Sequence, residues 1–204
     1  QIYRNSKQYS KYKYTCDVKS SPFNTFGITK TTSIKITNKS NIFDNKLYVS
    51  FPHLKKDIPI CILFKALGCL TDKEFIYNII KNDNSKLDNL LIKCLRSSII
   101  ETSDIKSEYD SIIYISKYIN HSNDSFSNDM KYEYTKSFIK KDVLPHLGDN
   151  LTNKVRYLGI MIYKLLKCYL EIDEPSNRDS YENKRIETSG VLIGSLIFQS
   201  MNRI

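Results

Sequence analysis

Hydrophobic and polar residues alternate along the first 51 positions of the chain. The alternation is clearest in YKYTCDV (12–18), SIKIT (33–37) and KLYVSF (46–51). A period of two places apolar side chains on one face of a strand and polar ones on the other, as in an antiparallel sheet with one wet side. Turn-forming residues fill the segments between these stretches. The pattern predicts a small antiparallel sheet of about three strands.

After Pro52 the apolar spacing changes to the three- and four-residue steps of helices. In DIPICILFKALG we expect Asp57 to cap a helix, Pro59 to lie in its first turn and Gly68 to end it. Two more helices are predicted at SEYDSIIYISKYI (107–119) and MKYEYTKSFIKKDVL (130–144), separated by a polar loop.

Two capping boxes predict where the next helices begin. Thr71 with Glu74 precedes one apolar run, and Ser85 with Asp88 precedes another. In this device the hydroxyl accepts from a backbone N–H three residues later, while the acidic side chain reaches back. Helices are therefore expected to start at these two positions.

The strongest helical pattern runs from about residue 152 to 170. Gly159 lies inside it, where glycine costs about 1 kcal/mol relative to alanine, so a close crossing with another helix is expected there. A final helix is predicted from about Ser189 to the chain end. It is apolar around much of its circumference, which predicts that a partner segment covers it.

These elements define an α+β fold: a small N-terminal antiparallel sheet and a larger helical body of six to seven helices. The length of 204 residues favours one domain, or one domain with an appendage. We divide the chain into a strand region (1–51), a helical body (52–176) and a basic connector with the terminal helix (177–204).

Charge and cysteine content narrow the class of protein. The formal net charge of +9 favours an anionic partner, most simply nucleic acid or an acidic protein. The five cysteines are odd in number and show no C-x-x-C spacing, so buried free thiols in a reducing compartment are expected. No segment has the pattern of a signal peptide, and the longest apolar stretch is too short to cross a membrane.

Catalytic motifs are absent from the sequence, including the phosphate-binding glycine loops, the HExxH zinc motif and the GxSxG nucleophile motif. Glu171, Asp173 and Glu174 resemble a magnesium site only in composition, and we interpret them as a solvated turn after a helix. Cys94 and Cys168 lie on predicted apolar faces without a neighbouring base. We expect no catalytic residue and no metal site in this chain.

Basic residues are the stronger candidates for a binding function. They form three clusters: Lys55 with Lys56, Lys140 with Lys141, and Arg178 with Lys184 and Arg185. Most such runs are solvated helix faces or caps, and this remains the simplest interpretation of Lys140 and Lys141. The last cluster belongs to a polar segment of about twelve residues between two strong helices, and loops of that length are often functional.

Three blocks occur in an order typical of one family: FPHLKKDIPICILFKALG (51–68), DVLPHLG with RYLGIMIYKLL (142–166), and NRDSYENKRIETSG (177–190). Together they resemble the lobe region of the second-largest subunit of multisubunit DNA-dependent RNA polymerases of the eukaryotic, archaeal and large-DNA-virus type. The resemblance extends over about 12–204 and is weak between 81 and 130.

The last block keeps part of the family pattern and loses part of it. The residues that keep it are Arg178, Asp179, Asn183, Lys184 and Arg185. The residues that replace the usual Asp, His and Gly are Asn177, Ser180 and Glu182. Glutamate tolerates positive φ poorly, so the turn is expected to differ from that of the family.

The resemblance implies a non-catalytic module of a nucleotidyltransferase that copies DNA into RNA. It implies a wall of the DNA cleft, a docking surface for initiation or elongation factors, and other polymerase subunits as partners. The magnesium of such an enzyme is held by another subunit. The implied location is the nucleus, or a cytoplasmic virus factory or virion, and the Lys, Asn, Ile and Tyr bias fits an A/T-rich source such as a large DNA virus or a protist.

The candidate contacts with nucleic acid are Arg178, Asn183, Lys184, Arg185, Lys55 and Lys56. They would meet phosphates without reading bases. Lys184 and Arg185 could instead pair with neighbouring carboxylates. The sequence also allows two other interpretations: a stand-alone basic nucleic-acid-binding domain, and a protein-interaction domain that recruits factors.

Overall fold

Five antiparallel strands form one sheet whose order follows the chain. The computed structural model describes residues 1–5, 10–22, 29–39, 41–80, 86–119, 127–177, 180–184, 186 and 188–201. The strands are β1 (Ile2–Arg4), β2 (Tyr12–Ser20), β3 (Lys30–Thr37), β4 (Leu47–Ser50) and β5 (Ile58–Pro59). The three strands expected from the sequence are the central ones, β2 to β4. The short edge strands β1 and β5 add to them.

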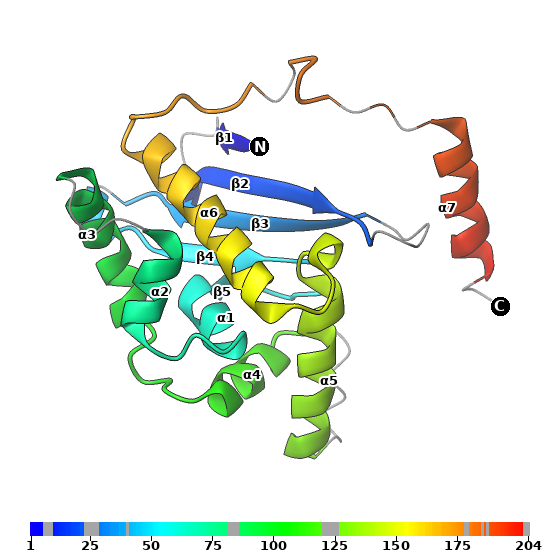
Figure 1. Cartoon of the computed structure of the whole chain (residues 1–204), viewed down its shortest axis with the longest axis horizontal. Coiled ribbons are helices and arrows are strands. Elements are labelled where there is room, and N and C mark those ends of the chain that lie inside the picture. Colours follow the sequence, from blue (N-terminus) through cyan, green and yellow to red (C-terminus); the bar gives the residue numbers. More distant parts are fainter. Residues whose placement is uncertain are drawn as a thin grey trace.

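One face of the sheet is the apolar face that the alternation predicted. Cys16 lies opposite Ile34, and Ile34 lies opposite Val49, and all three are buried. Helix α6 (Leu151–Tyr169) crosses this face (Figure 1). The rings of Tyr14 on β2 and Tyr169 on α6 meet edge to face, with centroids 6.3 Å apart. Burial of these side chains stabilises the layer by about 25 cal/mol per Å² of apolar surface.

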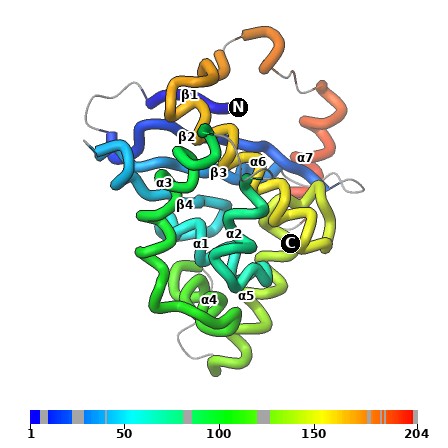
Figure 2. The backbone as a smooth tube through the Cα atoms, turned by 60° about the vertical axis from the view of Figure 1, so that its left-hand side comes forward, coloured from blue at the N-terminus to red at the C-terminus, as the bar shows by residue number. Residues whose placement is uncertain are grey.

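Six further α-helices and two short 3-10 helices, η1 (Ile42–Asp44) and η2 (Pro145–Leu147), lie in the described part of the chain. The α-helices are α1 (Ile60–Ala66), α2 (Asp72–Ile79), α3 (Lys86–Ile100), α4 (Glu108–Ser116), α5 (Asn128–Asp142) and α7 (Ser189–Met201). All seven residues of α1 are buried, and Figure 2 shows this helix in the middle of the body. Gly68, with φ of 99°, follows the end of α1, as expected of a glycine that terminates a helix. The architecture is the α+β fold that the sequence predicted.

The start of α1 differs from the prediction. Asp57 does not cap the helix; Pro59 occupies the N-cap position and provides no side-chain hydrogen bond. The carboxylate of Asp57 instead accepts hydrogen bonds from the Tyr12 hydroxyl at 2.6 Å and from the Lys35 ammonium at 2.9 Å. Asp57 binds these partners on β2 and β3 instead of the helix N-terminus, because two hydrogen bonds to its charged carboxylate are stronger than one bond to a backbone N–H of the helix.

The start of α2 agrees with the capping box, whereas that of α3 is not tested. The Thr71 hydroxyl accepts from the backbone N–H of Glu74 at 3.2 Å, so half of the predicted box is present. Ser85 lies outside the described residues.

Helix α7 is separate from the body. None of its residues is buried, and its large apolar side chains are 43–70% exposed. Figure 1 shows it at the end of the segment that leaves α6, away from the sheet and the other helices. The final helix is therefore apolar, as predicted, and the described residues do not cover its apolar surface.

The five cysteines are free thiols, four of them buried and Cys69 half-buried, as the cysteine count predicted. Burial raises the pKa of Cys16 to about 11 and that of Cys61 to about 12. These thiols therefore behave as small apolar core residues at neutral pH. In the described part of the chain, no helix combines the length and the apolar character that crossing a membrane requires.

Candidate nucleic-acid interface

Lys55 and Lys56 project from the turn between β4 and β5, and both are exposed. The turn is held by backbone contacts on its inner side. The backbone N–H of Lys55 donates to the carbonyl of Tyr118 at 2.7 Å, and Leu54 forms a β-bridge with Ile119. A fixed backbone presents both ammonium groups on the same short turn.

Asp57 anchors the far end of this turn. Burial acts to raise the pKa of the Asp57 carboxyl, but the hydrogen bonds from Tyr12 and Lys35 outweigh it and lower the pKa. The carboxylate is therefore ionised at neutral pH and keeps Lys35 in an ion pair. Lys35 thus forms an ion pair on the sheet, whereas Lys55 and Lys56 form none with the described residues.

The connector that follows α6 runs beside β1. The backbone N–H of Ser176 donates to the carbonyl of Ile2 at 2.7 Å, and its hydroxyl accepts from the N–H of Ile2 at 3.3 Å. The side chain of Gln1 donates to the carbonyl of Asn183 at 2.8 Å. These bonds tie the connector to the sheet edge at Ser176 and at Asn183, and Figure 1 shows the connector passing near β1.

Asn183 and Lys184 lie in a turn of the connector. The Asn183 side-chain amide donates to the carbonyl of Asn177 at 2.8 Å, and the backbone N–H groups of Asn183 and Lys184 both donate to the carbonyl of Ser180. The Lys184 side chain is exposed. Asn183 thus shapes the turn, and Lys184 is the side chain of the pair that projects outward. Arg178 and Arg185 lie outside the described residues.

The structure does not bring the two candidate clusters into one site. Lys55 and Lys56 precede β5, whereas Asn183 is tied to the residue before β1. Because β1 and β5 are the two edges of the five-stranded sheet, the two clusters lie at opposite edges of the sheet. A nucleic acid that touched both clusters would have to extend from one edge of the sheet to the other.

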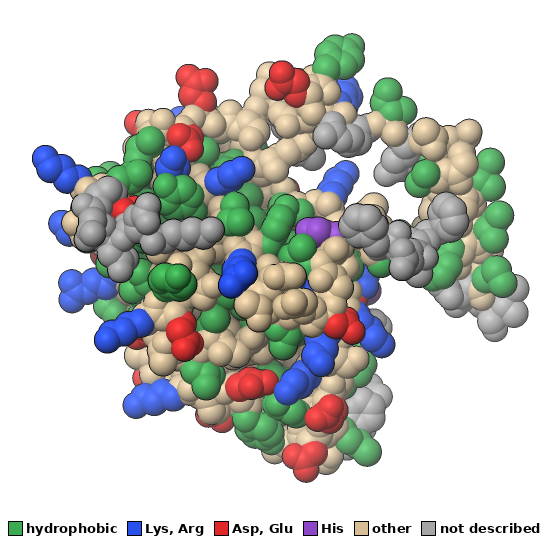
Figure 3. Space-filling model, viewed as in Figure 1, with side chains coloured by type: hydrophobic (Ala, Val, Ile, Leu, Met, Phe, Trp, Pro, Cys, Tyr) green, Lys and Arg blue, Asp and Glu red, His purple; other side chains and the backbone are tan. Residues whose placement is uncertain are grey.

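Other cations are dispersed over the body. The exposed side of α6 carries Arg156 and Lys164, and Lys140 and Lys141 lie in the last turn of α5. On the face drawn in Figure 3, the blue side chains are spread out and interleaved with red ones. The cations on this face thus form no single dense patch, and the net charge of +9 acts on an anion as a diffuse attraction.

The burial of two lysines was not predicted from the sequence. Lys154 on α6 donates to the Lys140 carbonyl, and burial lowers the pKa of its ammonium group to about 8. Lys65 on α1 donates to the carbonyls of Thr102 and Ile105, 2.7 and 2.6 Å away. The position of Lys154 beside the apolar residues Val155 and Leu158 was a sequence pattern that could have indicated its burial. No sequence pattern near either lysine indicated which backbone carbonyls its ammonium group contacts.

The acidic run after α6 forms a turn. Glu171 has φ of 59°, the N–H of Ile172 donates to the Lys167 carbonyl at 3.0 Å, and Asp173 pairs with Lys167 at 3.8 Å. Within the described ranges, no three His, Cys, Asp or Glu side chains converge on a common point. These residues therefore offer no donor set that fits magnesium.

Comparisons with known proteins agree with the resemblance of the sequence blocks. The DNA-directed RNA polymerase II subunit RPB2 of Schizosaccharomyces pombe is 31% identical over 160 residues, 76% of this chain and 13% of that protein. The polymerase subunit Rpo2 of Saccharolobus shibatae is 33% identical over 156 residues, which are 75% of this chain and 13% of that protein. The polymerase subunit 2 of Acanthamoeba polyphaga mimivirus is 32% identical over 181 residues, which are 79% of this chain and 15% of that protein.

The matched region has the extent of a domain within much longer proteins. The chain spans between 13% and 15% of the length of these three relatives. The family described as RNA polymerase Rpb2, domain 2, matches residues 2–187, from β1 to the end of the connector. This chain therefore belongs to that family, the lobe region of the second-largest subunit of RNA polymerase.

Proposed function

We propose that this chain is a non-catalytic lobe module of a DNA-dependent RNA polymerase, a nucleotidyltransferase, that forms part of the DNA cleft and a docking surface for transcription factors. The family match over residues 2–187 carries the proposal, because the relatives it groups with are DNA-directed RNA polymerase subunits. We place the magnesium and the reaction in another subunit.

Charge supports a role beside DNA. The net charge of +9 and the dispersed cations produce a diffuse positive field, which attracts phosphates without reading sequence. Lys55 and Lys56 are presented on a fixed turn, and Lys184 projects from the connector, so these three are the described side chains best placed to meet a backbone.

The exposed α7 supports a place within a larger subunit. The family match ends at residue 187 and α7 begins at Ser189, so the helix follows the domain directly. The relatives are several times longer than this chain. We infer that α7 packs against a neighbouring part of the same subunit. The division of the chain at residues 51 and 176, the location in nucleus or virus factory, and the docking factors stay predictions.

A salt titration of duplex binding tests the DNA role. The chain should bind duplexes of unrelated sequence with similar dissociation constants of about 10⁻⁴ to 10⁻⁶ M, with log affinity falling linearly against log salt. Replacing Lys55, Lys56 and Lys184 by glutamate should weaken binding to every duplex and reduce the salt slope by about one per lysine. Glutamate at Lys73, an exposed residue of α2, is the matched control and should change binding less.

Two outcomes would replace the proposed DNA role. Sequence-dependent binding at about 10⁻⁸ M or tighter would identify a stand-alone nucleic-acid-binding domain. An affinity that is unchanged by the triple substitution, together with capture of a protein partner, would leave factor docking as the function of the lobe and remove the DNA contact.

A further inference from the structure

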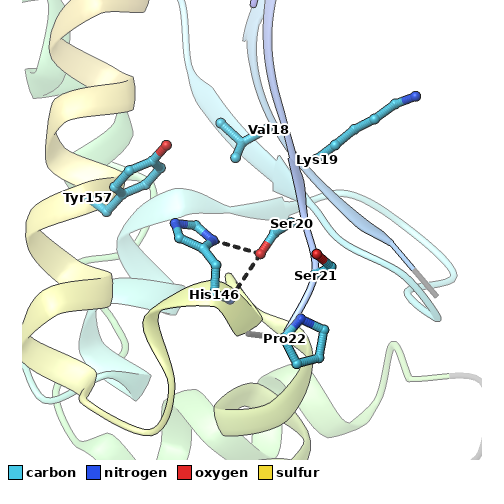
Figure 4. Close-up of a pocket in the computed structure, with 7 residues that line it drawn as sticks. All are labelled: Val18, Lys19, Ser20, Ser21, Pro22, His146 and Tyr157. Atoms are coloured by element: carbon cyan, nitrogen blue, oxygen red, sulfur yellow. Dashed lines mark hydrogen bonds between the residues drawn. The ribbon is translucent and has the colours of Figure 1, made fainter. Parts of the chain in front are cut away.

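A pocket of about 430 Å³ opens where the end of β2 meets the turn before α6. Its lining residues are Val18, Lys19, Ser20, Ser21, Pro22, His146 and Tyr157. Figure 4 shows the rings of His146 and Tyr157 on one side and the β2 residues on the other. None of these residues belongs to the basic clusters discussed above.

The His146 ring is held by a buried serine. The hydroxyl of Ser20 accepts from the backbone N–H of His146 at 3.1 Å and contacts the ring Nδ1 at 2.6 Å. In the described part of the chain this buried hydroxyl has no other acceptor, so its hydrogen goes to Nδ1. A neutral ring then carries its own hydrogen on Nε2, on the side away from Ser20 (Figure 4).

The interior of the pocket is neutral at physiological pH. Burial, and then the positive charge of Lys154, lower the pKa of His146, so the ring is uncharged. Lys19 projects from β2 away from His146 (Figure 4). The pocket thus offers the Nε2–H and the hydroxyls of Tyr157 and Ser21 as neutral hydrogen-bonding groups, and Lys19 is the cation among the described residues that line it. Such an interior suits a neutral polar group better than a bare phosphate.

The shape of the pocket suits a flat group. The rings of His146 and Tyr157 lie 5.1 Å apart between centroids at an interplanar angle of 75°, so they form a corner. A planar group that lies against one ring turns its edge toward the other. Val18 and Pro22 supply apolar surface opposite. Aromatic stacking combined with donors at the edge is the way in which proteins hold unstacked bases.

We propose that this pocket binds one unpaired base of single-stranded nucleic acid, with the base against Tyr157 and His146 and the adjoining phosphate near Lys19. The excess positive charge of the chain makes a nucleic acid a better source of such a planar group than a protein side chain. The proposal rests on the pocket and on the net charge of the chain, and its test is separate from that of duplex binding by Lys55, Lys56 and Lys184.

Single-stranded and duplex oligonucleotides of equal length test the proposal, with binding followed by fluorescence anisotropy at one fixed salt concentration. Tyr157→Leu should weaken single-strand binding about tenfold and duplex binding less than twofold. Tyr157→Phe keeps the ring and should keep most of the affinity. Tyr163→Leu is the matched control, because Tyr163 is also half-buried on α6 but does not line the pocket. Circular dichroism and thermal unfolding check that each variant folds.

A fluorescent base reports on the pocket directly. A single-stranded oligonucleotide with one 2-aminopurine should lose fluorescence on stacking when it binds the chain, and should lose less with Tyr157→Leu. The proposal is overturned if Tyr157→Leu, folded, binds single strands as tightly as the unaltered chain. It is also overturned if single-strand and duplex affinities fall together, or if Tyr163→Leu has the same effect as Tyr157→Leu.

Discussion

Gly159 of α6 packs directly against the backbone carbonyl of Asn78 in α2. A Cβ atom built on Gly159 would lie 2.1 Å from that carbonyl oxygen, far inside contact distance. Backbone is a rigid neighbour, so the two helices can approach this closely only because residue 159 has no side chain. The close helix crossing predicted from a glycine inside a helical pattern is thus confirmed.

Alanine at this crossing should destabilise the protein. Gly159→Ala forces α2 and α6 apart, and overpacking of this kind lowers the free energy of unfolding by about 1–3 kcal/mol despite the better helix propensity of alanine. Chemical denaturation monitored by circular dichroism measures the change. Gly190→Ala in α7 is the control, because a Cβ there meets no atom within 4 Å. Equal stability of the two variants would contradict the crossing.

Lys65 should be needed for stability rather than for binding. Its buried ammonium joins α1 to the segment after α3 through the carbonyls of Thr102 and Ile105. Lys65→Met retains much of the side-chain volume but leaves both carbonyls without this donor, and each unsatisfied buried group costs about 1–3 kcal/mol. Urea unfolding should show that loss for Lys65→Met and almost none for Lys73→Met, where the lysine is exposed.

The parts of the fold that could be predicted from the sequence are those that depend on neighbours in the chain. Period-two alternation identified β2, β3 and β4, and helical spacing identified α6 to within one residue at each end. The strands β1 and β5 have three and two residues, too few to show a period. They exist because a longer strand pairs with them.

The structural features that the sequence did not indicate depend on contacts between residues far apart in the chain. Asp57 was expected to cap α1, but its partners Tyr12 and Lys35 are 45 and 22 residues away. Ser20 and His146 are 126 residues apart, so no local pattern could place them in one pocket. Strand order likewise set Lys55 and Asn183 at opposite sheet edges. Lys55 had been a candidate because of its charge, and Asn183 because it keeps the pattern of the family block.

Alkaline pH should destabilise the protein partly through Cys61. Burial raises the pKa of this thiol from an ordinary 9.0 to about 12. A thiol whose folded pKa is raised contributes stability that is complete below pH 9 and is lost as pH rises toward 12, because the unfolded chain ionises first. At pH 10 this loss is about 1 kcal/mol.

Cys61→Ala isolates that contribution. The variant should be less stable than the unaltered chain at pH 7, where a buried side chain has been shortened. The difference should shrink by about 1 kcal/mol between pH 7 and pH 10, since alanine does not titrate. Urea unfolding at the two pH values measures this. A difference that stays constant with pH would show that the buried thiol is not protonated preferentially in the folded chain.

The apolar surface of α7 should drive association without supporting the fold of the body. Leu192 and Leu196 are 45% and 61% exposed, and no residue of the helix is buried. Replacing both by glutamate should leave the unfolding midpoint of the body unchanged and reduce concentration-dependent association in sedimentation velocity, because an exposed apolar helix seeks cover. Leu165→Glu, in the buried face of α6, is the contrasting variant and should unfold the chain. If the double variant lowered the unfolding midpoint substantially, α7 would have to pack on the body, and the inference that it docks on a neighbouring part of the subunit would be wrong.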